Sequence, residues 1–157
     1  LDVGNAFMMT ELGDVLAEDF RTVRNDPAYP LWLIPRRHNL LMNSNGTKIA
    51  KLNDGRPYNT VYMHPDTIAA LGLRLDAPVT VSSAHDSIPS VVESDRSLRL
   101  DVVAMHHGFG GLPTGPDEFL KRGSSVCRLV DVTVDFDPVT GIPRQGNIPV
   151  SVTARKG

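Results

Sequence analysis

Short runs of apolar and β-branched residues, separated by glycine, proline and asparagine, fill the sequence after residue 30. Each run has the length of a β-strand, and the turn residues between the runs prevent a helix from extending through them. This pattern, with few helical segments, predicts a mainly β protein and favours a closed β-barrel. We expect seven strands, over residues 31–34, 60–63, 79–82, 88–93, 100–105, 126–134 and 147–153.

A helical pattern precedes the first strand, in residues 10–24, with Thr10 as the expected N-cap and an end at residues 25–27. Its apolar face consists of Leu12, Val15, Leu16, Phe20 and Val23. We expect residues 1–29 to be a linker or a helix from a preceding domain, and residues 30–157 to form the barrel.

Turn and helix signals also lie between the strands. Residues 64–72 predict a short helix, because Pro65 suits its first position and Gly72 suits the position after its end. Residues 53–55 and 137–141 are rich in Asp, Gly and Pro and predict turns.

Composition excludes several classes of protein. The chain has 16 Lys and Arg against 18 Asp and Glu, a formal net charge of −2, so there is no basic excess for nucleic acid or for a membrane surface. No apolar run is long enough for a membrane span.

The single cysteine, Cys127, cannot form an internal disulfide, so we expect a cytoplasmic protein. The sequence begins with Leu1, from which we expect it to be part of a longer protein.

The first candidate site follows the first expected strand. Arg36, Arg37 and His38 come at the strand end, and Asn43 and Ser44 follow shortly after. Guanidinium groups suit phosphate oxygens, and amides or hydroxyls can read a base or ribose. The alternative is a solvated turn with ordinary ion pairs.

The second candidate site is the glycine-rich segment after the fifth strand. The adjacent His106 and His107 point to opposite faces of a strand, so they make a poor pair for one metal ion. The glycines of residues 108–111 would let backbone amides approach a ligand closely. One buried and one solvent-exposed histidine is the structural alternative.

Catalytic motifs are missing from the sequence. No Gly-x-Ser-x-Gly elbow, phosphate-binding loop or Gly-x-Gly-x-x-Gly fingerprint occurs. Cys127 lies among the apolar residues of the run 126–134, where a thiol is usually an inert hydrophobe. From the residues themselves, the chain is a β-rich domain with an anion or nucleotide site.

The order of the motifs adds a resemblance. The chain resembles the molybdopterin dinucleotide-binding domain, the C-terminal domain of the dimethyl sulfoxide reductase and formate dehydrogenase family of oxidoreductases, over roughly residues 30–153. The resemblance depends on an ordered series: Leu33-Ile34-Pro35-Arg36-Arg37-His38, Asn43-Ser44, Met63-His64-Pro65-Asp66, Leu71-Gly72-Leu73, Val79-Thr80-Val81-Ser82-Ser83, Val102-Val103-Ala104-Met105-His106-His107-Gly108-Phe109-Gly110 and Asp137-Pro138-Val139-Thr140-Gly141-Ile142-Pro143.

The resemblance implies a closed six-stranded double-psi β-barrel that grips the guanine dinucleotide arms of a molybdopterin cofactor carrying molybdenum or tungsten. The metal ligand and any iron–sulfur cluster then belong to other domains of a parent oxidoreductase, which are this domain's partners, and the domain has no catalytic or metal-binding residue of its own. The cofactor-binding residues implied are Arg36, Arg37, His38, Asn43, Ser44, His106, His107, Gly108 and Ser125.

The chain departs from the family pattern in three places. Where relatives have Gly-x-Asn-x-Asn, residues 123–127 read Gly-Ser-Ser-Val-Cys, so two amides are replaced and Ser125 keeps one polar group. The polar stretch that many relatives carry before Asn43 is Leu-Leu-Met at residues 40–42. The turn at residues 76–77 has lost its glycine.

Two other functions compete with cofactor binding. A double-psi barrel also serves as an adaptor or protein-binding module, which the lost asparagines favour and the arginine and histidine loops oppose. A small barrel enzyme of the aspartate decarboxylase type would need a self-processing Gly-Ser and a suitable lysine. Gly123 and Ser124 are present, but Lys121 precedes them and nothing else fits.

Overall fold

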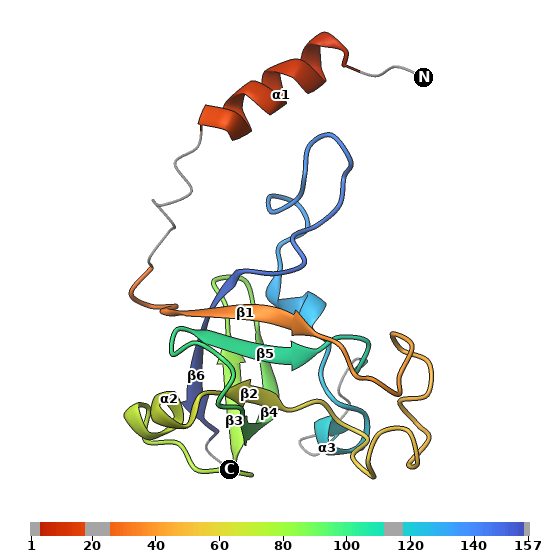
Figure 1. Cartoon of the computed structure of the whole chain (residues 1–157), viewed down its shortest axis with the longest axis vertical. Helices are drawn as coiled ribbons and strands as arrows, with labels where there is room; N and C mark the ends of the chain where they lie inside the picture. The colour runs from red at the N-terminus through yellow and green to blue at the C-terminus, as the bar shows by residue number, and fades with distance from the viewer. Residues whose placement is uncertain (1–3, 18–25, 112–117, 156–157) are drawn as a thin grey trace.

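In the computed structural model, which describes residues 4–17, 26–111 and 118–155, six strands close into one mixed β-barrel (Figure 1). The barrel order is β1-β5-β2-β4-β3-β6. The strands are β1 (Leu31–Arg36), β2 (Val61–Met63), β3 (Pro78–Ser82), β4 (Ser87–Ser94), β5 (Val102–His106) and β6 (Ile148–Ala154). The expected mainly β class and closed six-stranded barrel are therefore confirmed.

Strand direction decides which loops meet. β1 runs parallel to β5, with Arg36 opposite His106, and β2 runs parallel to β4. The four other pairings are antiparallel and complete the ring, with β6 joining β1 to β3. Because β1 and β5 are parallel and in register, the loops that follow them leave the barrel side by side.

Alternation along the strands fills the barrel. Leu31 and Leu33 of β1 point into the core, as do Val103 and Met105 of β5. The β-branched residues that predicted the strands supply most of the remaining interior, because their stiff side chains pack well on a pleated surface. Fully buried members include Val61, Met63, Val79, Val81, Ile88, Val92 and Val150.

The described helices are short apart from the first. They are α1 (Ala6–Ala17), α2 (Pro65–Ala70), α3 (Glu118–Arg122) and the 3-10 helix η1 (Val126–Leu129). α2 confirms the helix expected near residue 64: the His64 imidazole accepts a hydrogen bond from the backbone N–H of Asp66, and Pro65 begins the helix. None of the helices in the described part of the chain has the length and apolar character to cross a bilayer.

The strand expected over residues 126–134 is wrong. Residues 126–129 form η1 instead, and Asp131 then caps a turn by accepting hydrogen bonds from the backbone and hydroxyl of Thr133. The barrel is already closed by β6, so no strand edge is left for this apolar run to join. Cys127 is consequently exposed, not an inert core residue.

The N-terminal helix begins earlier than the pattern predicted. Thr10 lies inside α1, where its hydroxyl donates to the Ala6 carbonyl, and it is Asn5 whose side chain accepts from the Met8 backbone N–H at the start of the helix. The predicted face residues Phe20 and Val23 lie outside the described residues. No residue of α1 is buried.

Candidate functional site

The two candidate loops lie against each other at one end of the barrel. The Arg37 guanidinium donates a 3.1 Å hydrogen bond to Oδ1 of Asn43, and Nε2 of His107 lies 3.0 Å from the same oxygen. Asn43 thus links the loop after β1 to the loop after β5. The juxtaposition that the sequence interpretation required is present.

Two glycines permit this close packing. Gly108 has a φ of +83°, and a Cβ on it would lie 2.6 Å from the backbone carbonyl of Asn43. A Cβ on Gly110 would collide with the backbone of Ser124 and Ser125. The glycine-rich segment is therefore wedged between two other loops of the protein, whereas the sequence interpretation assigned these glycines to close approach of a ligand. The glycine-rich segment also brings Ser44 and Ser125 to the same end of the barrel.

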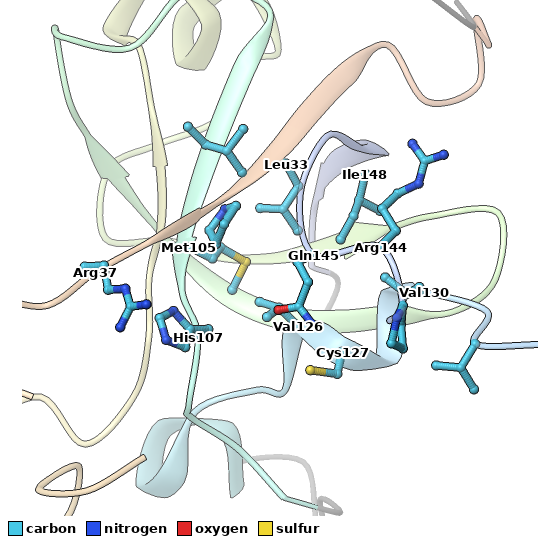
Figure 2. A pocket seen from close by; sticks show the side chains of 14 residues that line it. Leu33, Arg37, Met105, His107, Val126, Cys127, Val130, Arg144, Gln145 and Ile148 are labelled. Carbon is cyan, nitrogen blue, oxygen red and sulfur yellow. The ribbon is translucent and has the colours of Figure 1, made fainter. Parts of the chain in front are cut away.

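A pocket of about 260 Å³ opens beside these loops (Figure 2). Its floor continues the barrel core through Leu33 and Met105, and Arg37 and His107 stand on one rim. The opposite walls come from η1 and from the connection between η1 and β6. The complete lining is Leu33, Ile34, Pro35, Arg37, Met105, His107, Val126, Cys127, Val130, Val132, Pro143, Arg144, Gln145 and Ile148.

Three other predicted residues, Arg36, His38 and His106, form a separate cluster on the outer face of β1, β2 and β5. The ring centroids of His38 and His106 are 5.2 Å apart, and Tyr62 packs edge-on against His106 at 5.5 Å. The Arg36 guanidinium lies 4.0 Å above the Tyr62 ring. Strand alternation explains the division, since Arg36 and His106 point away from the face that carries Leu33 and Met105.

The two arginines differ in their partners. Arg36 forms an ion pair of 2.5 Å with Asp95, and hydrogen bonds from Ser97 and Arg36 lower the pKa of that carboxyl to about 2. Within the described residues, no ion pair includes Arg37. Arg37 is exposed, so its charge is available to a ligand.

The two histidines differ in burial. His106 is 7% exposed, and burial, aided by the nearby His38 and Arg36, lowers its pKa to about 4. It is therefore neutral at pH 7. His107 is only partly buried, but its Nδ1 is enclosed without a hydrogen-bond partner among the described residues. The described residues contain no group of three His, Cys, Asp or Glu side chains that could hold a metal ion.

Sequence reasoning missed Asn59, a buried residue that connects the end of β5 to the segment before η1. Its Nδ2 donates to the carbonyls of His106 at 2.8 Å and of Ser124 at 3.0 Å, and its Oδ1 accepts from the Ser124 backbone N–H at 2.9 Å. A lone asparagine before a strand carries no recognisable signal. Arg144 and Gln145 were also missed, because they follow a predicted turn with nothing to indicate that it folds back over the pocket.

Comparison with known proteins identifies related domains. A family model described as "Molydopterin dinucleotide binding domain" matches residues 31–149. Among solved structures, acetylene hydratase from Pelobacter acetylenicus is similar, with a TM-score of 0.67 and 20% identity over 81% of this chain. This chain spans 18% of the length of that enzyme. A search of curated proteins gives no match.

Adding a methyl group at Gly110 tests the wedge. Gly110→Ala should lower the free energy of unfolding by about 2–5 kcal/mol, because it combines backbone strain at a φ of +92° with a collision against residues 124–125. Gly111→Ala is the matched control: among the described residues, a Cβ there meets the Arg122 side chain alone, at 3.7 Å, and the change should stay within about 0.5 kcal/mol. Equal denaturant midpoints for the two variants would contradict the packing.

Burial of His106 makes stability depend on pH. As pH falls from 6.5 to 4, the unfolded chain protonates this histidine while the folded protein keeps it neutral, so stability is lost over this window. The loss amounts to about 3 kcal/mol, from the difference between the two pKa values. Urea unfolding across this pH range should show a smaller loss of unfolding free energy for His106→Gln than for the wild type. A histidine titration near 6.5 for His106 by NMR would show that the ring is not buried as described.

Proposed function

This chain belongs to the molydopterin dinucleotide binding domain family, and from that premise we propose that it holds the guanine dinucleotide part of a molybdopterin cofactor. The observation that carries the proposal is the convergence of Arg37 and His107 on Asn43 at the rim of the pocket. Four other residues of the predicted set hold this arrangement in place: Arg36, His38, His106 and Gly108.

Charge and hydrogen bonding at the rim suit a pyrophosphate. Arg37 has no carboxylate partner among the described residues and offers a planar set of N–H donors. His107 adds a ring nitrogen on the same side. Arg144, across the pocket, is partly neutralised by Asp135 at 2.7 Å, so Arg37 carries most of the attraction for the anion.

The interior of the pocket suits a planar base. Leu33, Met105 and Val126 give it an apolar lining, and the Gln145 carboxamide provides both a donor and an acceptor at its wall (Figure 2). A volume of about 260 Å³ lies just below the usual range for small-molecule pockets, so the pocket takes one part of a dinucleotide and not the whole. We expect the remainder to contact Asn43, Ser44 and Ser125, which lie at the same end of the barrel.

The residues present fit such a group on a structural ground. Arg37 and Gln145 both line the pocket, and Arg37 has no carboxylate partner among the described residues, so donors suited to a phosphorylated base are present. When bound, the pterin-held molybdenum or tungsten supplies the redox chemistry. The chain's own residues bind and orient the dinucleotide, and the chain alone catalyses no reaction.

Arg36, His38 and His106 support the site from the outer face of the barrel. Arg36 is fixed between Asp95 and Tyr62, and His106 is neutral and buried. In this role they set the direction in which Arg37 and His107 leave their strands. Gly108 supports the site in another way, by admitting the Asn43 backbone.

We also infer that the domain works within a larger cytoplasmic oxidoreductase and contacts its other domains. Support comes from large apolar side chains that are exposed in the described structure. Those of α1 are 49–77% exposed, and those of the projecting connection between η1 and β6 are 38–75% exposed (Figure 1). They are Phe7, Met9, Leu12, Val15 and Leu16 in α1, and Val132, Val134, Phe136, Val139 and Ile142 in the connection.

Titration with guanosine diphosphate tests the function. With about 10 mM ligand and a Kd of about 1 mM, binding should stabilise the 157-residue chain by about 1.4 kcal/mol and raise Tm by about 3–5 °C. Arg37→Ala should weaken binding about tenfold, because a charged hydrogen-bond donor to phosphate is lost. Calorimetry and thermal shift measure both.

Arg99→Ala is the matched control, because Arg99 is an exposed arginine paired with Asp101 before the start of β5, at the other end of that strand from His106. It should leave the Kd unchanged. Adenosine diphosphate and inorganic pyrophosphate separate recognition of the base from recognition of the phosphates. Absence of any response to guanosine diphosphate at millimolar concentration would overturn the proposed function.

A further inference from the structure

One wall of the pocket is a single turn of 3-10 helix that contributes little to its own stability. Val126, Cys127 and Val130 line the pocket from η1 and the residue after it, and we call residues 125–130 the pocket wall. Its internal backbone hydrogen bonds include those from Arg128 to Ser125 at 3.2 Å and from Val130 to Cys127 at 3.3 Å. So short a helix depends on outside contacts for its position.

The beginning of the pocket wall is anchored to the barrel. The Ser124 backbone is held on both sides by the Asn59 carboxamide, and the Ser124 hydroxyl donates a 2.6 Å hydrogen bond to the carbonyl of Pro89 in β4. Leu129, 2% exposed, enters the core. Between these two anchors Cys127 is exposed and its neighbours are only partly buried, so a further contact is needed to fix this part of the wall.

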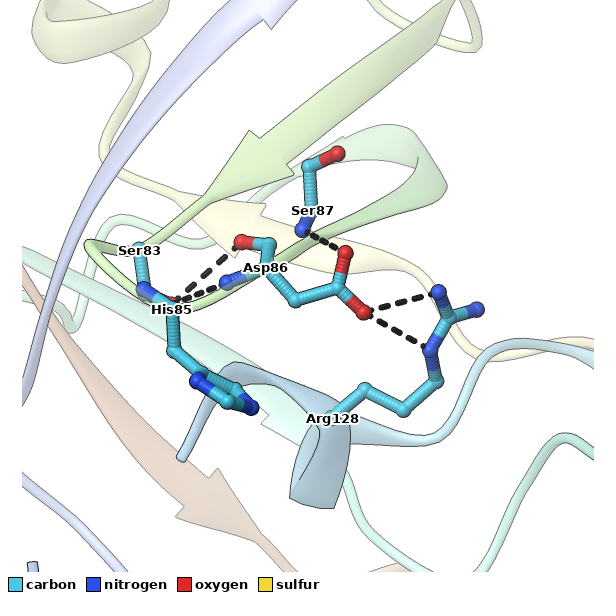
Figure 3. Close-up of polar contacts among 5 residues, drawn as sticks. All are labelled: Ser83, His85, Asp86, Ser87 and Arg128. Carbon is cyan, nitrogen blue, oxygen red and sulfur yellow. Dashed lines mark hydrogen bonds and ion pairs between the residues drawn. The ribbon is translucent and has the colours of Figure 1, made fainter. Parts of the chain in front are cut away.

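Arg128 provides that constraint through the turn between β3 and β4 (Figure 3). Its Nε and Nη2 donate to Oδ2 of Asp86 at 3.0 and 2.8 Å. Asp86 also accepts a 2.7 Å hydrogen bond from the Ser87 backbone N–H. This bond lowers the pKa of Asp86 most, and the bonds from Arg128 lower it further. The carboxylate is therefore ionised at neutral pH.

The turn that carries Asp86 is itself well fixed. The Ser83 backbone N–H donates to the Asp86 carbonyl at 2.9 Å, and the Ser83 hydroxyl accepts from the backbone of His85 at 3.1 Å and of Asp86 at 3.3 Å. Ser83 is only 8% exposed. A rigid turn thus presents a charged oxygen to the back of the pocket wall.

We propose that Asp86 and Arg128 are a positioning pair for the ligand pocket: by fixing the outer side of η1, they set the distance between the wall that bears Cys127 and the rim that bears Arg37. The proposal rests on the proposed function for the identity of the ligand. Neither residue lines the pocket, so the pair acts through the wall and does not contact the ligand.

Cys127 makes the position of the wall measurable. It is the single cysteine of the chain, it is exposed, and it lies on the pocket wall beside Arg128. Its rate of reaction with a thiol reagent such as Ellman's reagent therefore reports on the wall alone. In the wild-type chain, guanosine diphosphate should slow this reaction.

We expect Asp86→Asn and Arg128→Gln each to raise the Kd for guanosine diphosphate about threefold to fivefold. This change corresponds to the upper part of the range of free energies measured for exposed ion pairs. Each should raise the reaction rate of Cys127 severalfold in the absence of ligand. The double variant should behave like either single variant, because the two residues act as one unit. Asp101→Asn, which breaks the similar two-bond pair with Arg99, should change neither quantity.

The outcomes separate the two proposals. If guanosine diphosphate neither binds nor protects Cys127 in the wild-type chain, the proposed function fails, and the reaction rates without ligand still decide whether the pair positions the wall. If the wild type binds but the variants keep its Kd and its Cys127 rate, the positioning role is overturned. Lower stability at an unchanged Kd and rate would assign the pair to the fold alone, which also overturns the inference.

Discussion

The parallel pairing of β1 with β5 is the constraint on which the rest of the site depends. Register places Arg36 opposite His106, so the residues that follow the two strands, Arg37 and His107, reach the same side of the barrel. In an antiparallel pair the two loops would leave opposite ends, and Asn43 could not accept hydrogen bonds from both. This one pairing thus brings two weak sequence motifs together into one rim that carries Arg37 and His107.

Strand alternation then divides the chemistry between two faces. Arg36 and Arg37 are neighbours in sequence, yet Arg36 is neutralised by Asp95 on the outer face while Arg37 stands over the pocket. The two histidines are divided in the same way, with His106 on the outer face and His107 at the pocket. A site that recognises phosphate gains from this arrangement, because the paired outer cluster holds the strand ends rigid while the inner charge stays free for a ligand.

The sequence predicted those features that depend on residues close to one another in the chain. Short runs of apolar and β-branched residues predicted all six strands, and the Pro65 and Gly72 signals predicted α2, because side-chain stiffness and backbone freedom act within a few residues. Residues 126–134 carried the same apolar signal and formed η1 instead, since closure of the barrel is a long-range event that their pattern does not contain. The role of Asn59 could not be predicted for the same reason, because its partners, His106 and Ser124, lie 47 and 65 residues away in the sequence.

A closed barrel explains why the pocket must be walled by irregular segments. Every strand edge is paired and the interior is filled by side chains, so the only material free to surround a ligand is the connections that pass over the end of the barrel. Such segments have few hydrogen bonds of their own, and their positions are fixed by single polar residues such as Asn59 and Asp86. It follows that the pocket can change shape through substitutions that neither touch the ligand nor disturb the core. In this chain the hydrogen bonds of Asn59 to Ser124 and of Asp86 to Arg128 hold the two parts of that wall in place.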